Sequence, residues 1–200
     1  MLKAILFDLG NVIVPFDFSR AYARLEPLCK LSPDEIRSRL RATGVVQRFE
    51  TGQIDELSFV KEFSGALHLD ITHAEFCDLW SCIFLPQPLI PESLLEQLAA
   101  RYRLLMLSNT NSIHISMVRA NYPLLRHFHG AVLSHEVGAA KPSPKIFEHA
   151  IRKAGCDAQE CFFTDDLELN VTAARALGID AVRFESALQI ENELRSRGAM

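Results

Sequence analysis

Five short apolar segments along the chain predict the strands of a buried sheet. They lie at Ala4 to Leu9, Leu104 to Leu107, Ala131 to Ser134, Cys161 to Thr164 and Ala181 to Phe184. Each has the length of a strand buried on both faces, and stretches with helical character separate the last four. The pattern predicts an α/β fold in which helices cover both faces of a parallel sheet.

Helix boundary signals support this division of the chain. Pro91 begins a predicted helix, and Pro144 begins a second one that Gly155 ends. Proline suits the first helical position, and glycine suits the position after the last. A third predicted helix covers residues 168–177 and is closed by Gly178.

The segment from Phe16 to Pro88 has a different pattern, with several helical stretches and no clear strand. Capping boxes at 32–35 and 72–75 each head an amphipathic run, and a turn at 51–53 precedes another helix. We predict an all-helical domain at residues 16–88, inserted into a core formed by residues 1–15 and 89–200. Its own core is expected to contain six aromatic residues, namely Phe49, Phe59, Phe63, Phe76, Trp80 and Phe84.

Composition and charge exclude several classes of protein. The chain has 200 residues, of which 48% are hydrophobic and 23% charged, as expected for a globular protein with an adequate core. The net charge is -4 and no basic run occurs, so a nucleic-acid partner is not expected. No segment reaches the roughly 18 apolar residues of a membrane span. The five cysteines form no CxxC pair, and we expect reduced thiols in a cytoplasmic protein.

Polar residues lie at or after the ends of four of the predicted strands. Asp8, Ser108 and Asp165 each lie at the end of an apolar segment, and Ser134 ends a fourth. In an open parallel sheet ligands collect outside the carboxyl ends of the strands, so these side chains should share one crevice. The helical insertion leaves from the same edge and would cover that crevice as a lid, which excludes water and selects substrates. Asp8 is a candidate nucleophile, although Asp and Gly are also ordinary turn residues.

The pair Asp165-Asp166 predicts a cation site. Like charges side by side at the end of a buried strand repel each other, so a bound cation would explain them. Oxygen ligands near a substrate phosphate suit Mg²⁺, which uses one or two carboxylates and keeps several waters. The alternative is that Asp166 only caps the helix that begins near Glu168.

Two further polar positions predict an anion site. Ser108 and Asn109 precede a helix expected to begin near Ser112, and free backbone N–H groups at a helix N-terminus bind anions. Lys141 lies in a loop with few polar neighbours and would supply a positive charge. The alternatives are a polar turn that caps a helix and an ordinary surface lysine.

The segments FDLGNVIV, LSNTN, AAKPSPKIF and FFTDDLELN occur in this order across almost the whole chain. They resemble the four motifs of the haloacid dehalogenase (HAD) superfamily, and most closely its bacterial branch that includes a glucose-1-phosphate phosphatase. The resemblance implies a Rossmann-like HAD core with an inserted C1-type cap of four helices. It also implies a Mg²⁺-dependent phosphatase that hydrolyses small phosphorylated metabolites, with sugar phosphates as the expected class, through an aspartyl-phosphate.

The resemblance assigns roles to individual positions. Asp8 would be the nucleophile, and Lys141 would neutralise charge on the attacked group. The metal ligands would be Asp8, the carbonyl of Gly10, Asp165 and Asp166, and the substrate contacts would be Gly10, Asn11, Ser108, Asn109 and Lys141. The oligomeric state is not predicted.

One position departs from the family pattern. Most phosphatases of the superfamily carry a general acid–base aspartate two residues after the nucleophile, where this chain has Gly10; the branch named above shares the glycine. Such help is typically worth about 10²–10⁴-fold. Its absence would slow the enzyme, restrict it to good leaving groups, or shift the task to water or a cap residue. Arg48 and Glu50 are the first cap polar groups to test, and Pro15 replaces an acid common in related sequences.

None of the seven histidines is assigned a role; His127 and His129 are expected in a solvated loop.

Two other functions remain open from the sequence. A haloacid dehalogenase would use Asp8 on carbon, but the Asp165-Asp166 pair would repel its carboxylate substrate and a metal site would be unnecessary. A non-catalytic binding or regulatory protein could keep the fold without a general acid. The presence of Asp8, Lys141 and Asp165 together argues against such decay.

Overall fold

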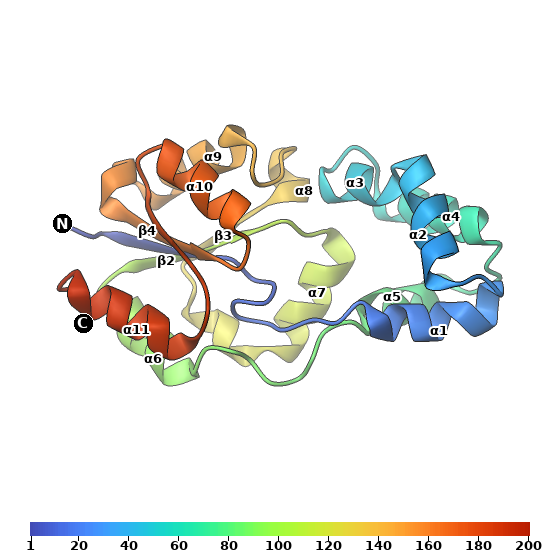
Figure 1. The fold of residues 1–200 in the computed structure, drawn as a ribbon, viewed down its shortest axis with the longest axis horizontal. Helices are drawn as coiled ribbons and strands as arrows, with labels where there is room; N and C mark the ends of the chain where they lie inside the picture. The colour runs from blue at the N-terminus through green and yellow to red at the C-terminus, as the bar shows by residue number, and fades with distance from the viewer.

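The computed structural model describes all 200 residues and contains one five-stranded sheet. The strands are β1 (Ala4–Phe7), β2 (Arg103–Ser108), β3 (Gly130–Leu133), β4 (Cys161–Asp165) and β5 (Asp180–Arg183). All neighbouring strands are parallel, in the order β3-β2-β1-β4-β5 (Figure 1). The predicted α/β fold is confirmed, and each strand boundary lies within two residues of its predicted position.

Helices cover both faces of the sheet. They are α6 (Glu92–Ala99), α7 (Ser112–Asn121), α8 (Ser134–Val137), α9 (Pro144–Ala154), α10 (Glu168–Ala176) and α11 (Ala187–Ser196), with short 3₁₀ helices at Pro123–His127 and Ala158–Glu160. Figure 1 shows α9 and α10 on one face and α6, α7 and α11 on the other. None of the helices is both long enough and apolar enough to cross a lipid bilayer.

Strand β1 shows why successive residues of the predicted strands are all apolar, because the two faces of the sheet are both buried. Ile5 and Phe7 belong to the hydrophobic cluster beneath α6 and α11, whereas Ala4 and Leu6 belong to the cluster beneath α9 and α10. All four side chains are fully buried. Burial of a large apolar side chain contributes roughly 1.5–3 kcal/mol, so both faces of the strand hold it in place. The strand therefore fixes the position of the residue that follows it.

The helical cap contains five helices where the resemblance implied four. They are α1 (Ser19–Cys29), α2 (Pro33–Thr43), α3 (Val45–Glu50), α4 (Glu56–Leu67) and α5 (His73–Ser81). Both predicted capping boxes are present, at the start of α2 and of α5. Five of the six aromatic residues predicted for the cap core form it with other apolar side chains. Phe84 is the exception, because it lies in the return linker and its ring packs edge-on against His114 of α7 at 5.0 Å.

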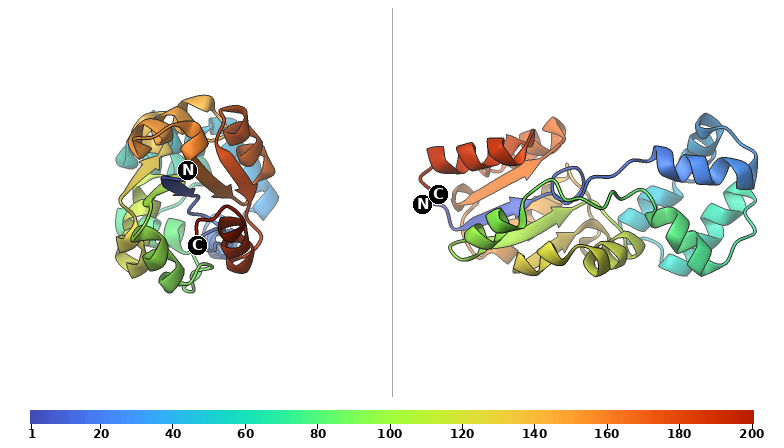
Figure 2. Two further views of the ribbon diagram at one scale, coloured as in Figure 1. Left: turned by 90° about the vertical axis from the view of Figure 1, so that its left-hand side faces the viewer. Right: turned by 90° about the horizontal axis from the view of Figure 1, so that it is seen from below.

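Two linkers join the cap to the core and pair with each other. Phe16 and Phe84 form an antiparallel bridge, and the backbone N–H of Leu85 donates to the carbonyl of Pro15 at 2.9 Å. The proposed domain boundaries, before residue 16 and after residue 88, fall in these linkers. The views of Figure 2 show the cap displaced from the sheet along the strand direction.

Candidate active site

Asp8 lies at the carboxyl end of β1, between two neighbouring strands. Its backbone N–H donates to the carbonyl of Thr164 at 3.0 Å, and its Oδ1 accepts a hydrogen bond from the N–H of Leu9 at 2.7 Å. The side chain is nearly buried, with 8% of the residue exposed. The strand and the turn therefore hold one carboxylate oxygen in a fixed direction.

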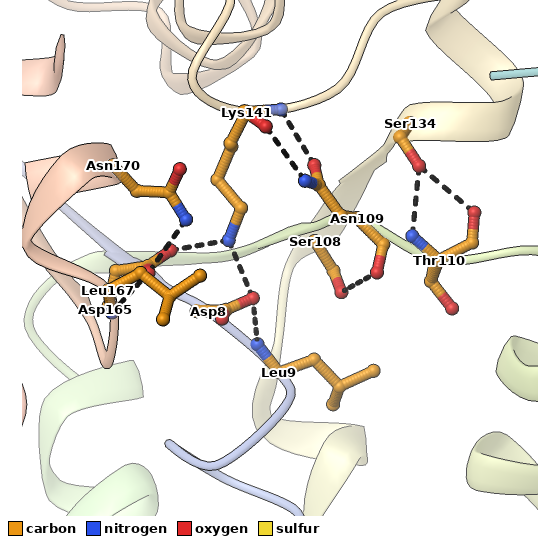
Figure 3. A network of polar contacts seen from close by, with 10 residues as sticks. All are labelled: Asp8, Leu9, Ser108, Asn109, Thr110, Ser134, Lys141, Asp165, Leu167 and Asn170. Atoms are coloured by element: carbon orange, nitrogen blue, oxygen red, sulfur yellow. Dashed lines mark hydrogen bonds and ion pairs between the residues drawn. The ribbon is translucent and has the colours of Figure 1, made fainter. Parts of the chain in front are cut away.

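Lys141 joins the ends of β1 and β4. Its ammonium Nζ lies 2.7 Å from Asp8 Oδ1 and 2.6 Å from Asp165 Oδ2 (Figure 3). Only 1% of the Lys141 side chain is exposed. Burial alone would lower the pKa of Lys141, but the charges of Asp8 and Asp165 outweigh it and raise the pKa above its ordinary value. The alternative of a surface lysine is therefore wrong, and the lysine stays charged.

Asp165 is fixed more firmly than any other carboxylate of the site. Its Oδ1 accepts hydrogen bonds from the N–H of Leu167 at 2.9 Å and from Nδ2 of Asn170 at 2.8 Å. With Oδ2 on Lys141, both oxygens have partners and the side chain is fully buried. The alternative in which Asp166 caps the next helix is also wrong, because Asp165 bonds the N–H of Leu167 and α10 has no side-chain cap.

The three acidic side chains suit a divalent cation. One carboxylate oxygen from each of Asp8, Asp165 and Asp166 lies within 4.8 Å of the other two. Asp8 and Asp165 are buried and Asp166 is half-buried, and the three carboxylates face only the one ammonium of Lys141. This excess of negative charge is costly without a cation. An all-oxygen set of ligands suits Mg²⁺, with water completing the octahedron. These residues therefore fit the predicted metal.

Burial and neighbouring charges raise the pKa values of two of these carboxyl groups. Burial, together with the charge of Asp165, raises the pKa of Asp8 to about 7 although Lys141 opposes the shift. Burial and the same neighbouring charge also raise the pKa of Asp166. A nucleophile has to be ionised, so a nearby positive charge beyond that of Lys141 would favour the reactive form of Asp8.

The polar turn after β2 contains the predicted anion-binding residues. Ser108 is buried at the end of the strand, and its hydroxyl has one weak contact, 3.5 Å from the carbonyl of Asn109. Asn109 is engaged differently from the prediction: its Nδ2 donates to the carbonyl of Lys141 at 2.9 Å, and its Oδ1 accepts from the Lys141 N–H at 2.7 Å. The Asn109 side chain therefore positions the lysine, and a phosphate contact by Asn109 stays a prediction.

Ser134 supports the same turn and was not predicted as a site residue. It is fully buried at the start of α8. Its hydroxyl accepts from the N–H of Thr110 at 2.9 Å and donates to the carbonyl of Thr110 at 3.0 Å. Its place at the end of a predicted strand was the only signal in the sequence, and the pairing with Thr110 depends on the packing of β2 beside β3.

Comparison with known proteins identifies the family. The family model for haloacid dehalogenase-like hydrolases matches residues 2–178. The chain belongs to the haloacid dehalogenase-like hydrolases. Over 200 residues it is 27% identical to the D-ribitol-5-phosphate phosphatase of Bacteroides thetaiotaomicron, with 97% of each chain covered.

Solved structures of a HAD family enzyme from Bacteroides thetaiotaomicron are similar throughout. The magnesium complex has a TM-score of 0.86 and 27% sequence identity, and covers 97% of this chain and 98% of the other. The wild-type complex with magnesium and inorganic phosphate has a TM-score of 0.84 and 28% identity, covering 93% and 96% of the two chains. The predicted superfamily and its fold are therefore confirmed.

Gly10 of this HAD hydrolase lies under an aromatic ring. A Cβ atom added at position 10 would come within 2.7 Å of Cε1 of Phe16. The Phe16 ring packs edge-on against Phe18, with 5.1 Å between centroids, and against Phe84. The place where most phosphatases of the superfamily carry their second aspartate is thus occupied by a side chain from the cap linker. Asn11, at a left-handed φ of 53°, turns the chain here and accepts a hydrogen bond from the Phe16 N–H at 3.2 Å.

The cap of this HAD hydrolase contains a cavity of about 390 Å³ between α1, α2, α3 and α5. Phe18, Tyr22, Glu50 and Trp80 contribute to its wall, and Phe18 connects it to Phe16 over Gly10. The indole Nε1 of Trp80 is buried and has no hydrogen-bond partner. The volume is within the usual range for small-molecule sites.

The two cap residues chosen from the sequence differ in their surroundings. Arg48 forms an ion pair with Glu62 on α4 and points to that partner. Glu50 has no ion pair, and burial raises its pKa to about 7. The turn after Glu50 reaches the core, because Gly52 lies so close to the carbonyl of His135 that only a glycine fits there. Glu50 therefore lies in the wall of the cavity, close in sequence to the cap–core contact, and its carboxyl group is protonated in part of the molecules at neutral pH.

The histidines do not form a metal site in the core. His127 lies in a 3₁₀ helix and pairs with Glu92 at 3.0 Å, and Nδ1 of His129 accepts from the N–H of Leu104 at 3.0 Å. The prediction of a solvated loop is confirmed for His129, which is exposed, and is wrong for His127, which lies in the 3₁₀ helix with 14% of its side chain exposed. His114 links the domains, since its Nε2 lies 3.0 Å from the carbonyl of Trp80, and burial lowers its pKa to about 4.

Proposed function

We propose that this protein is a Mg²⁺-dependent phosphatase of small phosphorylated sugars or polyols, working through a phosphoryl group on Asp8. The observation that carries the proposal is the contact of one buried ammonium, Lys141 Nζ, with both Asp8 and Asp165 at 2.6–2.7 Å beside a third carboxylate. Such an arrangement places a nucleophile, a positive charge and a metal site at one point.

The enzyme class and the cofactor have independent support. The relatives include a named phosphatase of a polyol phosphate and a structure with magnesium and inorganic phosphate. The predicted enzyme class, a phosphoric monoester hydrolase, and the predicted cofactor, Mg²⁺, agree with them. The choice of sugar or polyol phosphates as the substrate class is part of our proposal.

Asp8 would act first as a nucleophile. Its Oδ1 is held by Leu9 and Lys141, so Oδ2 is the oxygen free of protein hydrogen bonds (Figure 3). A carboxylate oxygen attacks phosphorus, the new O–P bond forms, and the bond from phosphorus to the leaving alcohol breaks. Lys141 and the hydroxyl of Ser108 stabilise the charge on the phosphoryl oxygens. Asp8, Asp165, Asp166 and the carbonyl of Gly10 would hold Mg²⁺, which would supply further positive charge near the transferred group.

Glu50 is the residue we assign to proton transfer. The leaving alcohol would extend from Asp8 towards the cap cavity and receive the proton of the Glu50 carboxyl as the P–O bond breaks. The resulting carboxylate then takes a proton from the water that attacks phosphorus, which releases phosphate and restores Asp8. A pKa of about 7 suits both steps, since such a group can give and accept a proton near neutral pH.

A panel of phosphate esters tests the function. Purified protein is incubated with sugar and polyol phosphates, with Mg²⁺ or with a chelator, and phosphate release is measured. We expect turnover only with Mg²⁺ and only in protein that has Asp8. Chloride release from a 2-chloro acid without metal would instead support the dehalogenase alternative. Folded protein without activity on any ester would favour a binding role.

A further inference from the structure

A second cluster of metal-binding side chains lies in the cap, apart from Asp8. Glu56 lies in the first turn of α4, and His73 and Cys77 lie on α5. Residues four positions apart share a face of a helix, so His73 and Cys77 point in the same direction. One potential ligand atom from each of the three residues lies within 4.8 Å of the other two.

The distances between these atoms approach those of a tetrahedral metal centre. His73 Nε2 lies 3.0 Å from Glu56 Oε1 and 3.8 Å from Cys77 Sγ. Around zinc, with bonds of about 2.0–2.3 Å, neighbouring ligand atoms are about 3.2–3.7 Å apart. Small side-chain rotations would therefore bring all three atoms onto one ion.

The donor set distinguishes this cluster from the acidic site in the core. It offers one imidazole nitrogen, one thiol sulfur and one carboxylate oxygen, a combination that suits Zn²⁺. Mg²⁺ prefers oxygen ligands alone and would remain with Asp8, Asp165 and Asp166. Three protein ligands also leave a fourth position for water.

The cluster is accessible and lies where the cap meets the core. Glu56 and Cys77 contribute to the wall of a cavity of about 320 Å³ that Ile113 and Met117 of α7 also line. Glu56 Oε2 accepts a hydrogen bond from the hydroxyl of Ser112 at 2.6 Å, so Glu56 already connects α4 to the first residue of α7. An ion on Glu56 Oε1 would leave that connection in place and add α5 to it.

We propose that Glu56, His73 and Cys77 form a site for a zinc-class divalent ion at the cap–core junction, separate from the Mg²⁺ site. Without the ion, the Nε2 of His73 and Glu56 Oε1 contact each other directly. With it, both contact the metal, and Cys77 binds as a thiolate after releasing its proton. Binding would stabilise the folded protein by mass action.

Cobalt provides a spectroscopic test in the whole protein. Co²⁺ is titrated into protein held in excess Mg²⁺, which occupies the acidic site, and the thiolate-to-cobalt absorption band is followed before displacement with Zn²⁺. We expect one equivalent of Co²⁺ to produce the band, and Zn²⁺ to abolish it. Cys77→Ser should lose the band, and His73→Gln should weaken binding by at least about tenfold. Cys82→Ser, which changes the cysteine at the end of the same helix, should behave as the wild type.

The outcomes separate the proposal from non-specific binding and from the proposed phosphatase activity. A band that persists in Cys77→Ser, or that disappears in Cys82→Ser, would overturn the site, as would the absence of any band in the wild type. If Cys77→Ser fails to fold, His73→Gln still tests the site, because this variant keeps the thiol of Cys77. Phosphate release is measured separately, so failure of either proposal leaves the other standing.

Discussion

The candidate active site at the sheet edge and the cap cavity both contain polar side chains, but these differ in how many protein partners they have. At the sheet edge, Asp165 uses both oxygens in hydrogen bonds or ion pairs, and Lys141 lies between two carboxylates. In the cap, Glu50 has no ion pair and the Nε1 of Trp80 has no partner. If the proposed function holds, the paired groups Lys141 and Asp165 are preorganised for one reaction, whereas Glu50 and the Nε1 of Trp80 would gain partners only from a ligand.

This difference suggests a division of roles, in which the sheet edge would carry out the reaction and the cap would select the substrate. Groups that stabilise a transition state work best when they are fixed before the reaction, because no reorganisation is then needed. Groups that recognise a leaving alcohol gain their partners only when it binds. Substitutions at the edge should therefore affect every substrate, and substitutions in the cap should affect substrates selectively.

The largest effect is expected at Asp8. Asp8→Asn keeps the shape and most hydrogen bonds but removes the nucleophile, so kcat should fall by at least about 10⁴-fold with every ester. Steady-state phosphate release measures it, with Asp70→Asn on the cap surface as the control. A fall that is restricted to one substrate would contradict the separation between edge and cap.

Lys141 should come next, with effects on both activity and stability. Lys141→Met removes the ammonium that faces the phosphoryl oxygens, and kcat should fall about 10²–10³-fold. It also leaves Asp8 and Asp165 buried without their cation, which should cost about 3–5 kcal/mol of unfolding free energy in a chelator. Denaturant unfolding with and without Mg²⁺ measures this loss and its partial recovery. The exposed neighbour Lys145, changed to Met, should alter neither quantity.

Glu50 should show selectivity. Glu50→Gln cannot donate the proton, so kcat for a sugar phosphate should fall about 10²-fold. For p-nitrophenyl phosphate, whose leaving group needs no proton, kcat should change little. In the wild type, kcat for the sugar phosphate should decrease above pH 7, where the Glu50 carboxyl ionises. Equal losses for both esters, or the same result from Glu26→Gln on α1, would contradict this role.

The smallest effect concerns stability at the cap–core contact. His114 is buried and neutral with a pKa of about 4, whereas in the unfolded chain its pKa returns to about 6.5. Between these values mainly the unfolded state binds the proton, so the unfolding free energy should fall by about 2.5 kcal/mol as the pH drops from 6.5 to 4. Unfolding curves across this range should show the fall in the wild type and in His68→Asn. His114→Gln should lack this component.

Much of the core could be predicted from the sequence because strands β1 to β4 are largely apolar on both faces. That pattern placed Asp8, Ser108 and Asp165 at one sheet edge, where the structure has them. The spacing of the motifs and the isolated lysine also indicated a charge at Lys141. Local patterns were sufficient for these residues because a strand end is defined by its own segment.

Other features depend on contacts between distant segments. Asn109 holds the backbone of Lys141, 32 positions later, and a polar turn gives no sign of such a partner. The sequence showed that Gly10 lacks the usual aspartate, but not that the ring of Phe16 lies in that space. His114 likewise looked ordinary until α7 was placed against the cap.

The central claim is that Asp8 carries the phosphoryl group, and trapping that intermediate tests it most directly. Protein turning over a sugar phosphate with Mg²⁺ is quenched and reduced with borohydride, which converts an aspartyl-phosphate to homoserine, and the peptides are analysed by mass spectrometry. We predict homoserine at position 8 in the wild type, and none when Mg²⁺ or substrate is omitted. Reduction at another carboxylate, or continued turnover by Asp8→Asn, would contradict the account.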